Sequence, residues 1–413
     1  MEGGGFKINT TNVKHLFLKI YLLILAYIVI GGSISLKLFN YFHYKGYYSY
    51  IENKYYFVDT NKGLEIIVAF TVIMVIVYWL YSKMKFNSDV YSDDLNLLKK
   101  FSNITLIVGV LGVLLRLKET GLVLLMGNEG ELTKSEGSGI SILLLMQLSN
   151  SVLFDYMIIY YSDKKKGRVF MAILKCLILL LFGSRNIVIT IILTILIHRY
   201  TNSIIKFSKM KIIIIAIVVG VSSFAYKSLL TVTEYSKESL ILRLTTDFAP
   251  EYREYLKIVT NVPDYAPYIS YTPIIESFAY IIPEEVFSAV GASKSDYYLQ
   301  TVNYVKYVIN SNYQGGIRSG IYSEVYLMNG IYSILIFAVV VGIVLAFIDK
   351  RVYNIKSNNK ESMPSNIITI YIGGTICLIQ LFGVTVIVYK LFTMFLFWYP
   401  YKILAKSKFK QIK

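Results

Sequence analysis

Long apolar runs recur along most of this chain, and they limit its fold more than any other feature. About ten such runs are present, several of them close to twenty residues long. An α-helix rises ~1.5 Å per residue and the hydrocarbon core of a bilayer is about 30 Å thick, so runs of this length suit membrane-spanning helices. Apolar residues make up 55% of the sequence, which is more than a soluble domain carries. The sequence therefore predicts an all-α polytopic membrane protein.

The predicted topology places both ends of the chain in the cytoplasm. With the N-terminus inside, roughly 23 Lys and Arg residues fall in inner segments and roughly seven in the short outer loops. The opposite orientation would invert this ratio. The formal net charge of +16 follows the same pattern, so we exclude a nucleic-acid partner. We expect one membrane domain, residues 1–413, with spans at 17–37, 64–82, 102–126, 139–161, 169–183, 186–198, 212–228, 326–348, 366–384 and 386–401.

One long hydrophilic segment, residues 227–318, is predicted to form a large extracytoplasmic loop. It holds five of the seven prolines and many tyrosines, and its charges nearly cancel. The stretches KESLILRLTTDF and EYREYLKIV have apolar residues at helical spacing, and Pro250 suits the start of the second helix. We predict two or three short helices on or in the outer surface. Ordered loops of this length tend to be lids or binding elements, although a variable cap without chemistry remains an alternative.

The stretch LLLFGSRNIVIT places Arg185 between two apolar runs that are each short for a span. We expect two short helices here, with Arg185 at the floor of an outward-facing cavity. A guanidinium binds phosphate oxygens in a bidentate manner, and the hydroxyl of Ser184 and nearby backbone N–H groups would add donors. The alternative is a tight outer hairpin whose arginine only anchors at lipid headgroups.

Other charges within the apolar runs have simpler interpretations. Lys19 and Lys175 are close enough to the predicted inner surface for their amines to extend to the headgroups. Arg116 is followed by Lys118 and Glu119 near the outer end of the third span. An interfacial ion-pair cluster and a substrate contact are equally good explanations of Arg116.

The stretch GGIRSGIYSEVYLMNGIYSILIF closes the large loop and enters the eighth predicted span. Arg318 ends the loop, and Glu324 follows more than one turn into the helix, with Tyr322 as a nearby substrate contact. A carboxylate at the outer, lumen-facing part of a span can act as a general base toward a hydroxyl group. Alternatively, Glu324 pairs with Arg318 or Arg243 and holds the loop against the bundle. Gly330 is expected to allow close helix packing.

The layout resembles the Wzy-type polymerases of O-antigen and capsule repeat units, a group related to the O-antigen ligases. The resemblance rests on FGSRN at 182–186, on the long outer loop, and on SEVYLMNGIYSILIF at 323–337. The similarity in topology covers most of the chain, whereas the similarity in sequence motifs covers about twenty residues. The late helix lacks the histidine of the related ligases in its outer half, and the loop arginines do not match the arginine-and-glycine spacing of some members.

The resemblance implies a glycosyltransferase of the GT-C type in the bacterial inner membrane, independent of metals and of other cofactors. Its substrates would be oligosaccharides linked to undecaprenyl diphosphate, and its partners a flippase and a chain-length regulator. The arginines that hold the diphosphates would be Arg185, Arg243, Arg253 and Arg318, with Glu324 as the base. A ligase of finished glycan and a flippase of lipid-linked oligosaccharide are the competing hypotheses.

Overall fold

Every regular element in the part of the chain that the structure describes is a helix. The computed structural model describes residues 14–44, 58–84, 94–120, 138–161, 166–182, 185–201, 250–282, 284–297, 300–309, 320–358, 363–381 and 383–412. Within these ranges there is no β-strand. The prediction of an all-α protein is confirmed for them.

Most of the described residues belong to a bundle of apolar helices. Its members are α1 (Leu16–Tyr44), α2 (Thr60–Ser82), α3 (Leu95–Thr120), α5 (Ser138–Leu145), α6 (Gln147–Tyr161), α7 (Lys166–Leu181), α8 (Arg185–Thr201), α15 (Gly320–Asn358), α16 (Met363–Leu378), the 3-10 helix η3 (Ile379–Leu381) and α17 (Val384–Ile412).

Six stretches of these helices are long and apolar enough to cross a membrane. They are Leu16–Leu38, Thr60–Ser82, Leu95–Lys118, Ile140–Tyr161, Gly320–Tyr353 and Pro364–Leu381, and Ile187–Thr201 is a shorter apolar helix. The chain is therefore a membrane-embedded helical protein. The predicted span at 212–228 lies outside the described residues, so the count of ten stays a prediction.

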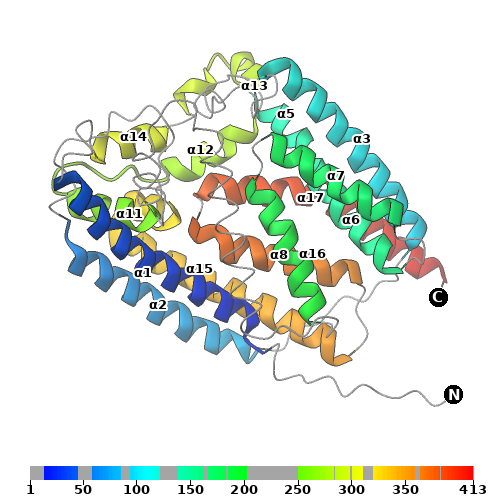
Figure 1. Ribbon diagram of the computed structural model, residues 1–413, viewed down its shortest axis with the longest axis horizontal. Helices are drawn as coiled ribbons and strands as arrows, with labels where there is room; N and C mark the ends of the chain where they lie inside the picture. The colour runs from blue at the N-terminus through cyan, green and yellow to red at the C-terminus, as the bar shows by residue number, and fades with distance from the viewer. Residues whose placement is uncertain are drawn as a thin grey trace.

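The bundle consists of two groups of helices with a third set between them (Figure 1). In one group, α1, α2 and α15 pack together, and in the other, α3 packs on α5 and α6, and α6 packs on α7. Helices α8, α16 and α17 lie between the groups, with α16 in contact with both α1 and α8. Many large apolar side chains remain exposed on the outer surface of the bundle, for example Leu23, Val68 and Ile107. Such a surface suits contact with lipid rather than water.

The described part of the large loop forms a helical cap at one end of the bundle (Figure 1). Four α-helices and one 3-10 helix are present there, where two or three were predicted: α11 (Pro250–Asn261), α12 (Thr272–Ile281), α13 (Glu284–Ala289), η2 (Lys294–Asp296) and α14 (Gln300–Ile309). Pro250 begins α11, as predicted, since its missing N–H is not needed in a first turn. The stretch KESLILRLTTDF lies outside the described residues. We call this side of the bundle the loop end.

Helix α15 is broken close to the loop end. Asn329 and Gly330 have non-helical dihedral angles, and Gly330 adopts φ 58° and ψ −138°, a conformation essentially restricted to glycine. A Cβ at residue 330 would also overlap the hydroxyl of Tyr268. Gly330 was predicted to allow close packing, and the neighbour that approaches it is Tyr268 of the loop; the sharp turn of the backbone at this residue was not predicted.

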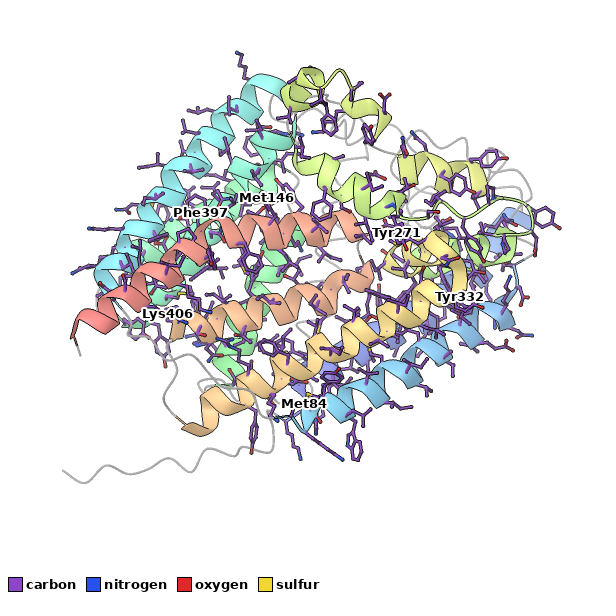
Figure 2. All side chains as sticks on the ribbon, turned by 180° about the vertical axis from the view of Figure 1, so that it is seen from behind. Met84, Met146, Tyr271, Tyr332, Phe397 and Lys406 are labelled. Carbon is purple, nitrogen blue, oxygen red and sulfur yellow. The ribbon has the colours of Figure 1, made fainter. Side chains whose placement is uncertain are left out.

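The break folds the first segment of α15, residues 320–328, back alongside the second. The rings of Tyr322 and Phe337 both pack on Phe70, with centroids 5.2 and 5.8 Å away. In a straight helix residues 322 and 337 would be ~22 Å apart, too far for both rings to reach one phenylalanine. Figure 2 labels Tyr332, which follows the break and is 70% exposed. The first segment of α15 is thus a short helix inserted into the bundle.

At the opposite end of α2 lies a compact polar cluster, which we call the far end. Asp349 accepts hydrogen bonds from the backbone N–H groups of Phe17 (2.7 Å) and Leu18 (3.1 Å) and from the Tyr78 hydroxyl (2.9 Å). His15 Nδ1 lies 2.7 Å from the same hydroxyl. Asp349 therefore caps the first turn of α1 and joins it to α2 and α15.

Candidate functional site

Glu324 lies on the inserted segment of α15 and contacts the first turn of α17. The backbone N–H of Val384, the first residue of that helix, donates a 2.6 Å hydrogen bond to Glu324 Oε2. The carboxylate also touches Gly383, where a Cβ would collide with both of its oxygens. A negative charge is favoured at a helix N-terminus by the unpaired N–H groups and the helix dipole. These contacts hold the carboxylate of Glu324 in place, and the side chain is only partly buried.

The segment that carries Glu324 is held by a buried network around Gln380. The Tyr322 hydroxyl donates to Gln380 Oε1 (2.9 Å) and lies 3.1 Å from the Tyr21 hydroxyl. Gln380 Nε2 donates to the backbone carbonyls of Tyr21 (2.9 Å) and Cys377 (3.2 Å). Tyr322 was predicted to contact substrate, and it is 4% exposed with its hydroxyl in this network. Its visible contacts fix the position of the inserted segment.

Helix α11 brings charged side chains into the same part of the molecule. Its four ionisable acidic and basic side chains are at most 6% exposed: Glu251, Arg253, Glu254 and Lys257. The guanidinium of Arg253 donates to Glu254 Oε1 from Nη2 (2.8 Å) and Nε (3.2 Å). A Cβ at Gly320, one turn before Glu324, would lie 3.0 Å from Glu251 Cβ. Buried charge is costly unless it is paired, so α11 is not an ordinary surface helix.

The tyrosines of α11 attach it to the bundle. The Tyr255 hydroxyl donates to the backbone carbonyl of Gly63 at the start of α2 (3.2 Å), and the ring lies 6.4 Å from that of Tyr322. Burial raises the pKa of both Tyr252 and Tyr255 above the ordinary value, so their hydroxyls stay protonated and act as donors. The cap is thus fixed to α2 and α15 through α11.

The predicted phosphate contacts are only partly described. Arg185 is the first residue of α8, immediately after the break that follows α7, in agreement with two short helices. Its side chain lies outside the described residues, as do Ser184, Arg243 and Arg318. Arg253 is described above. Arg116 is 2% exposed on α3, which lies in the other helix group, and no described contact brings it to Glu324.

The two lysines that were expected to reach the headgroups differ in the structure. Lys19 is exposed, and its amine donates to the carbonyl of Lys14 (3.3 Å). Lys175 is 3% exposed and forms an ion pair with Asp155, which also accepts from Arg168 (3.1 Å) and from Ser102 (2.7 Å). The prediction was wrong for Lys175, because a buried carboxylate on α6 neutralises the amine inside the protein. Asp155, set between apolar residues, was the signal that our sequence interpretation missed.

Two further polar residues were also missed, and both lie near the start of α17. Gln380 interrupts the apolar run before it, and Lys390 lies six residues after its first residue. Lys390 is 3% exposed, and its amine donates to the hydroxyl of Thr190 on α8 (2.9 Å). A lysine within a predicted span is the sequence signal that could have identified this position.

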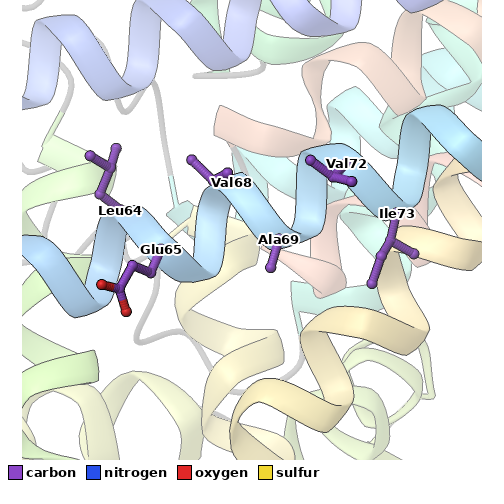
Figure 3. Close-up of a pocket in the computed structure, with 6 residues that line it drawn as sticks. All are labelled: Leu64, Glu65, Val68, Ala69, Val72 and Ile73. Atoms are coloured by element: carbon purple, nitrogen blue, oxygen red, sulfur yellow. The ribbon is translucent and has the colours of Figure 1, made fainter.

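Other features of the described residues are separate from this site. Asp59, just before α2, caps that helix by accepting from the N–H of Lys62 (2.8 Å). A shallow groove of about 480 Å³ runs along the lipid-facing side of α2 (Figure 3), and its lining is apolar except for Glu65. Among the described residues, no three His, Cys, Asp or Glu side chains are grouped to hold a metal ion.

Comparison with known proteins adds no family to this description. No family model matches the chain, and neither does any curated protein or any solved structure.

Proposed function

We propose that this protein is a membrane-embedded glycosyltransferase that polymerises lipid-linked oligosaccharide repeat units at the outer face of a bacterial inner membrane. The observation that carries the proposal is the position of Glu324. Its partly exposed carboxylate lies at the loop end, on a segment inserted into the bundle, and against the first turn of α17. This combination holds a carboxylate that can serve as a base within reach of substrates that approach from the membrane.

In the proposed reaction, the acceptor is one repeat unit on undecaprenyl diphosphate and the donor is the growing glycan on the same lipid. A hydroxyl oxygen of the acceptor forms a bond to the anomeric carbon of the donor. The bond from that carbon to the diphosphate oxygen breaks, and its electron pair leaves with the lipid diphosphate. Glu324 takes the proton of the attacking hydroxyl and later releases it to water.

The leaving diphosphate would be stabilised by cations and by helix N-termini. Arg185 begins α8, so its guanidinium and the N–H groups of that helix start can act on the same anion. Arg243, Arg253 and Arg318 of the loop are the further candidates. Electrostatic stabilisation of a good leaving group needs no proton transfer, which suits permanently charged arginines.

The decisive experiment is deletion of the gene, followed by gel analysis of the surface glycan of the cell. A polymerase predicts loss of the long-chain ladder, with a single repeat unit still attached to its final acceptor. A ligase predicts loss of both, with lipid-linked polymer accumulating instead. An unchanged ladder would sink the proposal.

A narrower test addresses Arg185. We predict that Arg185→Lys loses most polymer, because a lysine amine cannot form the bidentate contact of a guanidinium. Protein level in the membrane, measured by immunoblot, should stay normal. Near-normal long-chain glycan in this variant would leave Arg185 as a headgroup anchor only.

A flippase is the second candidate, and one observation favours it. Transporters often place broken helices at their binding sites, and here α15 is broken at 329–330 while a 3-10 turn separates α16 from α17. The two functions differ in what accumulates after gene deletion. A flippase predicts single lipid-linked repeats protected from externally added enzymes, whereas a polymerase predicts accessible ones.

A further inference from the structure

Lys390 is a buried charge that the proposed reaction does not use. It lies on α17 with 3% exposure, and Thr190, whose hydroxyl accepts its 2.9 Å hydrogen bond, is fully buried on α8. Placing an ammonium group inside an apolar bundle is costly, so such residues usually have a specific task. The task here can be derived from what each helix carries at its beginning.

The two helices run in the same direction past this hydrogen bond. Near it, Asn150 of α6 donates to the carbonyl of Thr393 (3.0 Å), and further along, Tyr156 of α6 pairs with His198 of α8 (2.9 Å). Phe154 of α6 stacks on Trp398, with centroids 4.3 Å apart. Later residues of α6 therefore meet later residues of both α8 and α17, so all three helices are parallel.

The hydrogen bond lies at nearly the same depth below both helix starts. Thr190 is five residues after Arg185, the first residue of α8, and Lys390 is six after Val384, the first of α17. At ~1.5 Å per residue these separations are ~8 and ~9 Å. A helical side chain also leans toward the helix N-terminus, so the amine of Lys390 lies closer still to the start of α17. The starts of α8 and α17 are consequently neighbours on the loop side of the bond.

We infer that the Lys390–Thr190 hydrogen bond is a strut that fixes the spacing between the Arg185-bearing start of α8 and the Glu324-capped start of α17. Lys390 and Thr190 are positioning residues, and neither touches substrate. The inference rests on the proposed function. It states that one buried hydrogen bond sets the distance between Arg185, the cation that binds the leaving group, and Glu324, the base that activates the acceptor.

The first test measures polymer formation by purified protein from lipid-linked repeat units. Lys390→Met keeps the volume of the side chain and removes its donor, and Thr190→Val removes the acceptor. Both should lower kcat by about 10- to 100-fold, because a displacement of about 1 Å between reacting groups has this effect. Thr190→Ser, which keeps the hydroxyl, and Lys19→Met, at an exposed lysine, should retain the wild-type rate.

Thermal unfolding in detergent separates positioning from a general loss of structure. Replacing a buried charge and its partner with apolar residues is often neutral or stabilising, so Lys390→Met with Thr190→Val should keep the wild-type Tm while kcat stays low. A double variant that recovers the wild-type rate would overturn the positioning role. A wild-type rate of polymer formation in Lys390→Met, measured beside an active wild-type protein, would also overturn the positioning role.

A distance measurement tests the strut without relying on activity. Spin labels at Ile192→Cys on α8 and Phe392→Cys on α17, both exposed positions, would be placed in a Cys176→Ala, Cys377→Ala background. Lys390→Met should broaden the label-to-label distance distribution, and Lys19→Met should not. An unchanged width in Lys390→Met would overturn the strut. If the wild-type protein forms no polymer, the proposed function fails, while the distances still decide whether the strut exists.

Discussion

The two ends of α15 each present a carboxylate to the start of another helix, yet the two carboxylates have different surroundings. Asp349 at the far end receives two backbone N–H groups of α1 and the Tyr78 hydroxyl, and it is 5% exposed. Glu324 at the loop end receives the N–H of Val384 and is only partly buried. The same local interaction therefore involves a buried carboxylate at one end of the bundle and a partly exposed carboxylate at the other.

If Glu324 is the base that we propose, this difference separates stability from chemistry along one helix. A carboxylate that is sealed by several donors joins elements, and its loss should unfold the protein. A partly exposed carboxylate held beside a helix N-terminus is fixed in position and stays accessible for proton exchange. Substitutions at the two ends should consequently affect different measurements.

The largest effect is expected at the loop end. Glu324→Gln keeps an oxygen that accepts from Val384 but removes the base, so polymer formation should fall by about 10²- to 10⁴-fold. Tm in detergent should change little. The same substitution at Glu65, an exposed carboxylate on α2, is the matched control and should leave the rate unchanged. Unaltered glycan chain length in Glu324→Gln would rule out the role of base.

At the far end we expect the converse. Asp349→Ala leaves two helical N–H groups without their acceptor, and each unsatisfied buried group costs about 1–3 kcal/mol. The free energy of unfolding and the protein level should therefore drop by a large margin, while polymer formed per folded molecule stays near wild type. A variant that accumulates normally but forms no polymer would show that the far end takes part in the chemistry.

Gly330 connects the two ends, because its turn places the Glu324 segment beside the rest of α15. Gly330→Ala imposes a side chain at φ 58°, which costs about 1–3 kcal/mol, and directs a methyl group at Tyr268. We expect a lower Tm together with slower polymer formation. Gly167→Ala, where an added Cβ meets nothing within 4 Å, should change neither. Equal behaviour of the two variants would mean that the turn does not position Glu324.

The sequence was a good guide wherever one physical rule dominates. The length of apolar runs located the candidate membrane-spanning stretches at 16–38, 60–82 and 140–161 to within a few residues, because crossing a bilayer sets a minimum length. The break between α7 and α8 and the start of α11 at Pro250 were predicted for equally local reasons. Glu324 was chosen because of its position near the start of a late helix, and the structure confirms that position.

The sequence was a poor guide wherever a distant residue decides. Lys175 looks free to reach the lipid headgroups until Asp155, on another helix, pairs with it. Gly330 was expected to allow close packing, but neither its neighbour, Tyr268 of the loop, nor the turn of the backbone was predicted. The backbone N–H of Val384, sixty residues later, donates to Glu324, and no sequence pattern pointed to this contact. Such pairings depend on how helices are arranged in space, which no local pattern encodes.

The smallest effect we predict concerns pH at the far end. Burial, followed by the charges of Lys14 and Lys19, lowers the pKa of His15 from its ordinary value of 6.5. In the unfolded chain His15 gains a proton as the pH falls below ~6.5, while in the folded protein it stays neutral to a lower pH, so stability declines over that range. His15 is only partly buried, which keeps this decline small. We therefore expect Tm to fall between pH 7.5 and pH 5.5 more in the wild-type protein than in His15→Gln, whose side chain does not titrate. A steeper decline in His15→Gln would contradict the assignment, and an effect of this substitution on polymer formed per folded molecule would show that the two ends of α15 are coupled.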